Sequence, residues 1–126
     1  MKIETSTENG VLIALAEGPE KLITGPQEAL DLAMTVKYET GSQRIALPKK
    51  LVAEEFFILS SGMAGEILQK YINYQFKLAI WGDFSRYTSK PLHDFIYESN
   101  QGKDFFFVAT QEEAVSRLAQ AGQPAP

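Results

Sequence analysis

The residues with the clearest chemical potential are Ser60, Ser61 and Gly62, which stand directly before a stretch of helical apolar periodicity. A serine hydroxyl at a helix N-terminus accepts a hydrogen bond from an exposed amide, and such a cap contributes about 1 kcal/mol. The same amides and the helix dipole also favour an anion or a phosphoserine. Glu66, one turn further on, already places a carboxylate in that field. The spacing therefore predicts a plain N-cap, with an anion or phosphoserine site as the alternative.

A second group combines a carboxylate, a hydroxyl, two aromatic rings and two cations within one loop. Its candidate binding residues are Asp83, Phe84, Ser85, Arg86, Tyr87 and Lys90. Because ligands of open α/β sheets bind at the carboxyl ends of the strands, we expect Asp83, the Ser60–Ser61 turn and Thr110 to share one rim. Arg86 and Lys90 could hold a small anionic ligand there. The alternative is a solvated loop in which Asp83 and Ser85 bond to local amides.

Gly65 is the third feature, since a glycine inside a helix costs about 1 kcal/mol relative to alanine. Close approach of this helix to the sheet would explain the missing side chain. A flat surface for a protein partner, with Met63 beside it, is the alternative. Interfaces are enriched in aromatic residues, methionine and arginine. We therefore predict that Phe84, Arg86 and Tyr87 join Met63 and Gly65 in a surface that binds a protein, a second copy included.

No catalytic residue, metal site or cofactor is predicted. His93 and Asp94 are adjacent, so on a helix they point apart and cannot act as a pair. The chain has one histidine and no cysteine, which leaves no thiol nucleophile and no thiolate metal site. Neither a glycine-rich phosphate loop nor a G-x-S-x-G elbow is present. A binding module is thus favoured over an enzyme.

The charge and apolar patterning indicate a cytoplasmic globular protein. The formal net charge of −4 argues against a nucleic-acid partner, because phosphate backbones attract basic surfaces. The N-terminal residues MKIETSTENG lack the apolar core of a signal peptide. No apolar run approaches the roughly 20 residues of a membrane span, so no membrane partner is expected.

The candidate residues must be positioned by alternating strands and helices. Asn9-Gly10 between two strand-like runs predicts an N-terminal hairpin, because both residues tolerate positive φ. Residues 78–81 are apolar throughout, as in a central strand of a parallel sheet. Further strands are predicted over 44–47 and 105–108. The order β-β-α-β-α-β-α-β-α implies one α/β domain over residues 1–121 with a mostly parallel, mixed sheet, followed by a disordered tail over 122–126.

The predicted helices begin at recognisable signals. Pro26 suits a first helical turn, Ser89 is a predicted N-cap, and Thr110 with Glu113 forms a capping box. The apolar stripe expected on the first helix consists of Ala29, Leu30, Ala33 and Met34. Before Ser60, the run Phe56-Phe57-Ile58-Leu59 is predicted to be a buried anchor for the next helix.

The order of elements and the Ser60-Ser61-Gly62 turn, followed by Ile67-Leu68, resemble the STAS fold of sulphate-transporter and anti-sigma-factor-antagonist domains. More specifically, the stretches AGEILQK, LAIWGDFSRYTSK and HDFIYESNQG resemble a bacterial family known as domain of unknown function 4180, over residues 8 to 118. The STAS resemblance implies a regulatory, protein-binding module. It would place a phosphorylated serine at Ser60. The sequence departs from the STAS motif at Leu59, where that motif has aspartate, and by the insertion of residues 49–59.

Overall fold

Strands and helices alternate along the chain in the order expected from the sequence. A computed structural model describes residues 1–122. Its elements are β1 (Lys2–Glu8), β2 (Val11–Glu17), α1 (Pro26–Thr40), β3 (Arg44–Pro48), the 3-10 turns η1 (Lys49–Leu51), η2 (Glu54–Phe57) and η3 (Leu59–Ser61), α2 (Met63–Asn73), β4 (Lys77–Trp81), α3 (Lys90–Gln101), β5 (Phe105–Val108) and α4 (Gln111–Gln120). The predicted α/β class is confirmed. Apart from Gly122, the tail predicted over 122–126 lies outside the described residues.

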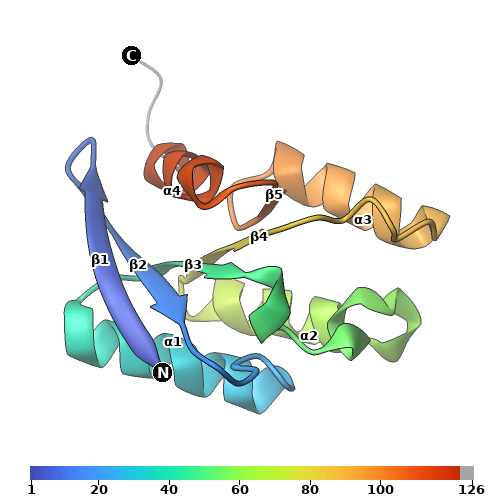
Figure 1. Cartoon of the computed structure of the whole chain (residues 1–126), viewed down its shortest axis with the longest axis horizontal. Helices are drawn as coiled ribbons and strands as arrows, with labels where there is room; N and C mark the ends of the chain where they lie inside the picture. The colour runs from blue at the N-terminus through green and yellow to red at the C-terminus, as the bar shows by residue number, and fades with distance from the viewer. Residues whose placement is uncertain (123–126) are drawn as a thin grey trace.

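The strands form one mixed sheet in the order β1-β2-β3-β4-β5. β1 pairs with β2 in antiparallel orientation, and the pairs from β2 to β5 are parallel. Because the order never reverses, right-handed crossovers place α1, α2 and α3 on the same face. Figure 1 shows α1 and α2 beneath the sheet and α4 on its opposite side. Of the helices within residues 1–122, only α4 covers the second face.

The two faces of the sheet bury cores of unequal size. On β4, Leu78 and Ile80 point into the larger core with α1, α2 and α3, whereas Ala79 points toward α4. Ala46 on β3 lies next to Ala79 in the register and faces the same way. Two alanines at these positions let α4 pack close to the sheet. The predicted central strand is confirmed, since β4 lies between β3 and β5 and Ile80 is 0% exposed.

The hairpin turn and the N-caps at Ser89 and Thr110 form as predicted. Asn9 and Gly10 have φ values of 53° and 76°, the positive pair that a two-residue hairpin turn requires. The Ser89 side chain accepts a hydrogen bond from the amide of Leu92, and the Thr110 side chain accepts one from the amide of Glu113. Each of these signals acts within a few residues, which is why the sequence sufficed to predict them.

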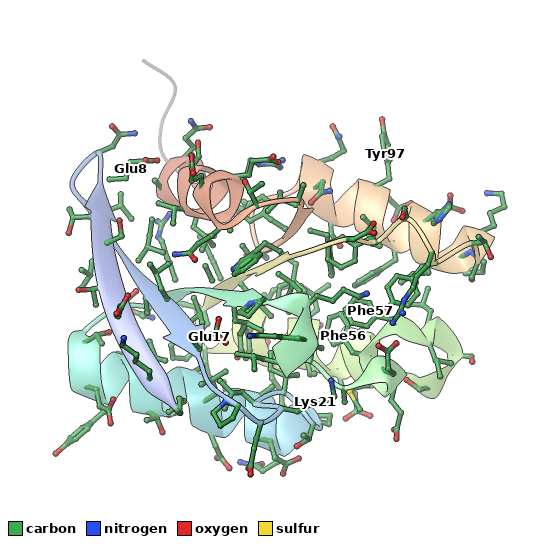
Figure 2. The ribbon with its side chains drawn as sticks, viewed as in Figure 1. Glu8, Glu17, Lys21, Phe56, Phe57 and Tyr97 are labelled. Atoms are coloured by element: carbon green, nitrogen blue, oxygen red, sulfur yellow. The ribbon has the colours of Figure 1, made fainter. Side chains whose placement is uncertain are left out.

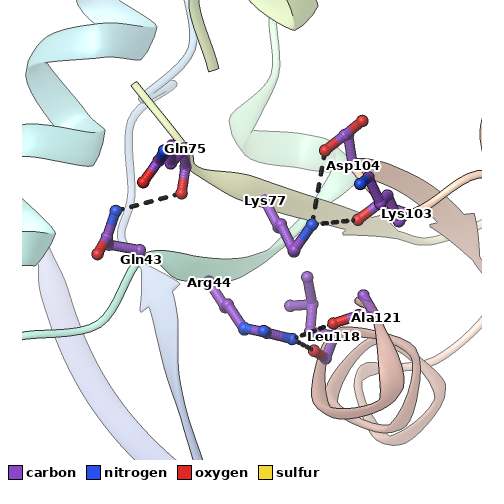
Figure 3. Close-up of polar contacts among 8 residues, drawn as sticks. All are labelled: Gln43, Arg44, Gln75, Lys77, Lys103, Asp104, Leu118 and Ala121. Atoms are coloured by element: carbon purple, nitrogen blue, oxygen red, sulfur yellow. Dashed lines mark hydrogen bonds and ion pairs between the residues drawn. The ribbon is translucent and has the colours of Figure 1, made fainter. Parts of the chain in front are cut away.

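Side chains also tie the amino ends of β3 and β4 to distant segments (Figure 3). The half-buried guanidinium of Arg44 donates hydrogen bonds to the carbonyls of Leu118 and Ala121, the latter at 2.8 Å. These carbonyls belong to the C-terminal end of α4, where a cation is favourable. Burial lowers the pKa of the Arg44 guanidinium from its ordinary value. On the neighbouring strand, Lys77 donates to the carbonyl of Lys103 at 2.8 Å.

The outer edge of β5 is closed by a side chain from α3. The Asn100 amide nitrogen donates to the carbonyl of Phe107 at 3.0 Å, and the amide of Phe107 donates to Asn100 Oδ1 at 2.8 Å. Asn100 thus makes the two hydrogen bonds that another strand would make. Arg117 of α4 donates to the Asn100 carbonyl and lies over the Phe106 ring. This arrangement joins α3, β5 and α4.

Two predicted burial assignments are wrong. Met34 is 41% exposed, because the face of α1 that meets the sheet is formed by residues 29, 32, 33 and 36. Ile58 is 55% exposed, although Phe56 and Phe57 are buried as predicted (Figure 2). The consecutive turns η2 and η3 rotate successive side chains around a tight backbone, so the four-residue apolar run cannot face one side.

Within residues 1–122, no helix combines the length and the apolar character needed to cross a membrane.

Candidate functional site

The loop of residues 82–89 is held against the 3-10 segment by aromatic packing. The ring of Phe57 in η2 stacks on Tyr87, with centroids 4.9 Å apart and planes at 17°. Phe84 packs against Phe57 at 5.9 Å and against Phe107 of β5 at 5.7 Å. The aromatic side chains predicted for an interface are therefore both partly buried and turned toward the core.

Arg86 and Tyr87 share one carboxylate, that of Glu54 in η2. Arg86 Nη2 lies 3.2 Å from Glu54 Oε1, and the Tyr87 hydroxyl donates to Glu54 Oε2 at 2.9 Å. Burial, followed by the hydrogen bond to Glu54, raises the pKa of the Tyr87 hydroxyl. Lys49 lies over the Tyr87 ring at 4.6 Å from its centroid. These contacts join the loop to the 3-10 segment through both charge and ring packing.

The remaining polar groups of the loop also bond locally. The hydroxyl and then the amide of Ser85 lower the pKa of the Asp83 carboxyl, and the amide lies 2.9 Å from Asp83 Oδ1. Lys90 pairs with Asp94 at 2.8 Å, one turn along α3. Both cations predicted to hold an anion, Arg86 and Lys90, thus have carboxylate partners. Each of these pairs is exposed and contributes little to stability.

At the N-terminus of α2, the two serines have different surroundings. Ser61 Oγ accepts a hydrogen bond from the amide of Met63 at 3.2 Å and donates one to the carbonyl of Glu55 at 2.8 Å. Gly62 adopts φ 80°, a left-handed conformation that glycine accepts without strain. Gly62 itself occupies the N-cap position without a side-chain cap, so the predicted serine N-cap is wrong. Ser61, one residue earlier, ties the first turn of α2 to η2. Ser60 is exposed, and its hydroxyl has no hydrogen bond to any of residues 1–122.

Gly65 and Met63 do not form a pair on the surface. Met63 is 8% exposed and packs into the larger core. Gly65 is exposed, and a Cβ built there meets no atom within 4 Å. The explanation of Gly65 by close approach to the sheet is therefore wrong. The glycine leaves an open, flat area on the outer side of α2.

We use the term rim surface for the exposed residues Ile58, Ser60, Gly62, Gly65 and Arg86. The segment 54–61 carries Ile58 and Ser60. Glu54 joins it to Arg86, and Ser61 joins it to the first turn of α2, where Gly62 and Gly65 lie. Ile58 is the member that the sequence did not identify. A periodicity analysis finds an apolar side chain there but cannot tell which way it points.

A groove lined in part by the same loop contains residues that sequence reasoning missed. It has a volume of about 740 Å³ and lies between the carboxyl ends of β4 and β5, α3 and α4. Asp83 and Phe84 line it, together with Trp81, Glu113 and Arg117. The spacing of Glu113 and Arg117, four residues apart on one helix face, was the available signal. One cation and two carboxylates give this groove no strong preference for anions.

Within residues 1–122, no three histidine, cysteine, aspartate or glutamate side chains converge to form a possible metal site. The arrangement around the rim can bury apolar surface and form hydrogen bonds. It offers no serine, lysine or histidine paired with a base in the manner of a nucleophile.

Comparisons with known proteins agree with the narrower of the two resemblances. Neither the curated proteins nor the solved structures gave a significant match. Residues 8–118 match the model of the family described as Domain of unknown function (DUF4180), and the chain belongs to that family.

Proposed function

We propose that this chain is a non-catalytic, STAS-like regulatory module that binds a protein partner through the rim surface. Ile58 is the observation that carries the proposal. A branched apolar side chain is 55% exposed, yet it lies on a 3-10 segment that Phe56 and Phe57 fix to the core. Covering this side chain would remove its apolar surface from water, which favours association. Because the segment is already held in place, a protein partner would cover Ile58 with little further loss of conformational entropy.

The surroundings of Ile58 match the composition of a protein interface. Interfaces combine an apolar centre with a polar border. Gly62 and Gly65 present no side chain at the start of α2, and Arg86 supplies a cation that pairs with Glu54. An incoming carboxylate could exchange with Glu54, because such exposed pairs are weak.

Ser60 provides a place for regulation of this surface. Its hydroxyl is exposed at the N-terminus of α2, where the helix dipole stabilises a phosphate. In the STAS resemblance, this is the position of the phosphorylated serine. A phosphate there would place about two negative charges inside the rim surface. Ser60→Asp should therefore weaken partner binding, whereas Ser60→Ala should not.

To test the proposed binding surface, the same isoleucine-to-serine change is made at two exposed positions, one inside the rim surface and one outside it. Ile58→Ser and Ile72→Ser each shorten an exposed isoleucine, and these are 55% and 42% exposed. Ile72 lies near the far end of α2. A tagged chain is used to recover partners from a native lysate of the source organism, and the proteins recovered are quantified. We expect Ile58→Ser to lose a specific partner that Ile72→Ser retains, with both variants melting close to the wild type. Equal recovery by both variants would refute the proposal.

A small molecule bound in the groove lined by Trp81, Asp83, Phe84 and Arg117 is the second candidate. Its support is the position of the groove, at the carboxyl ends of two parallel strands, where ligands of α/β sheets bind. The two functions separate in a melting experiment. A panel of small anions and planar metabolites should leave the melting temperature unchanged if only a protein binds, and should raise it if the groove is the site.

A further inference from the structure

The sheet has one closed and one open edge. Asn100 occupies the outer edge of β5, whereas β1 ends the sheet on the other side, with no element of residues 1–122 beyond it (Figure 1). β1 pairs with β2 in unbroken register from Lys2↔Glu17 to Glu8↔Val11. It contains no proline and no bulge, two of the devices that keep exposed strands from pairing.

The hairpin turn determines which backbone groups of β1 are free. In a two-residue loop, the flanking residues Glu8 and Val11 exchange both hydrogen bonds, and bonded pairs alternate along the ladder. Residues 2, 4, 6 and 8 therefore bond to β2. The amides and carbonyls of Ile3, Thr5 and Thr7 point away from the sheet. They present three donors and three acceptors for another strand.

A second copy of the chain is the occupant that the charges favour. Two copies related by a two-fold axis pair the same edge in antiparallel orientation. When the axis passes through Thr5, all seven residues pair. Lys2 of each copy then lies opposite Glu8 of the other copy, which gives two such pairs in the dimer. Glu4 of each copy lies opposite Ser6 of the other. Opposite charges across strands are favourable and like charges are unfavourable.

The neighbouring registers lack this complementarity. Moving the axis to Glu4 places Glu4 opposite its own copy. Moving it to Ser6 places Glu4 of each copy opposite Glu8 of the other, which gives two pairs of carboxylates. Both registers also leave one of the three outward residues opposite a position outside β1, and they put carboxylates face to face. The Lys2–Glu4 ion pair within one chain, at 2.9 Å, joins two exposed side chains and offers little resistance to rearrangement.

We propose that two copies of this chain associate through β1, centred on Thr5, so that two five-stranded sheets become one continuous sheet. This surface is separate from the rim surface and does not depend on it. One added strand pair buries less area than the roughly 1,000 Å² of a stable interface, so the association is weak. It becomes measurable at high protein concentration.

A charge exchange tests the register. Sedimentation equilibrium is measured for the wild type, Lys2→Glu, Glu8→Lys, the double variant and Glu20→Lys, an exposed control outside β1. Each single variant turns two attractive pairs into repulsive ones, which should weaken the dimer roughly tenfold or more. The double variant restores opposite charges and should dimerise like the wild type, as should the control. Failure of the double variant to recover would overturn the proposal.

An edge block tests the surface itself. Thr5→Pro removes an outward amide and leaves the hydrogen bonds of β1 with β2, since proline is tolerated on an edge strand. We expect Thr5→Pro to be monomeric and Thr5→Val to dimerise, with slower exchange of the amides of residues 3, 5 and 7 in the dimer. A dimer that survives Thr5→Pro, or a wild type that stays monomeric up to its solubility limit, would refute the proposal. If Thr5→Pro does not fold, the charge exchange decides.

Discussion

Replacing Asn100 with alanine should destabilise the protein at one defined place. The side-chain amide makes two hydrogen bonds to the backbone of Phe107, at 3.0 and 2.8 Å, and both lie in a partly buried region. Truncation leaves the amide and the carbonyl of Phe107 without these partners at the edge of the sheet. With a net contribution of roughly 0.5–1.5 kcal/mol for each bond, the variant should lose about 1–3 kcal/mol.

Urea denaturation gives the loss in unfolding free energy, and hydrogen exchange locates it. The amide of Phe107 should exchange faster in Asn100→Ala even where the rest of β5 stays protected. Asn73→Ala is the matched control, because Asn73 also lies at the end of a helix and its side chain accepts a hydrogen bond only from the exposed Gln69. The freed edge of β5, which carries the run Phe105–Val108, should also increase aggregation.

A loss below about 0.5 kcal/mol, or one equal to that of Asn73→Ala, would refute this reasoning. Asn100 would then act only at the C-terminal end of α3. Asn100→Asp refines the test, because it keeps the acceptor for the Phe107 amide and places a carboxylate oxygen against the Phe107 carbonyl. It should destabilise at least as much as Asn100→Ala.

Three further predictions concern the core, the N-terminus of α2 and the loop of residues 82–89. Ile80→Asp places an unpaired carboxylate in the larger core, so a cooperative melt near that of the wild type would contradict our placement of β4. Ser61→Ala should cost about 1 kcal/mol in thermal or urea unfolding, whereas Ser60→Ala should cost nothing, because only Ser61 bonds to Met63 and Glu55. The pKa of the Asp83 carboxyl should lie below its ordinary value in an NMR titration, and Ser85→Ala should raise it. Because that pKa is lowered in the folded state, the carboxylate stabilises the fold above the unfolded pKa, and this contribution disappears as the pH falls through the folded pKa.

The sequence predicted those features that depend on neighbouring residues. Asn9-Gly10, Ser89 and Thr110 act within four residues of themselves, and the apolar run of β4 identifies a strand buried on both faces. From that strand and the alternation of elements, the parallel sheet and its hairpin followed. The Ser60-Ser61-Gly62 turn was also placed correctly at the N-terminus of α2.

The errors concern the direction of side chains. Met34 lies at the border of the apolar stripe on α1, where a small rotation of the helix decides its exposure. For Ile58, the two 3-10 turns set the direction, and no periodicity analysis of an apolar run resolves such short turns. The surroundings of Gly65 depend on which parts of the protein pack near that side of α2. Helix propensity carries no information about such neighbours.

Contacts between distant residues were not predictable from one sequence. Arg44 bonds to the end of α4, more than 70 residues away along the chain. The role of Asn100 was not predicted, because its bonds to Phe107 form only when α3 folds back along β5. Arg117 is an ordinary helical cation in the sequence, and its place over the Phe106 ring arises from the packing of α4.

The central claim is that the rim surface, which includes Gly65 on α2, binds a protein. A series of Gly65, Gly65→Ala and Gly65→Gln tests it most directly, because a Cβ at this position meets no atom within 4 Å. Both substitutions should raise stability by up to about 1 kcal/mol, since glycine is unfavourable inside a helix. We predict that recovery of the partner from native lysate falls from glycine to alanine to glutamine while the melting temperature rises. Unchanged recovery by a well-folded Gly65→Gln would contradict the claim.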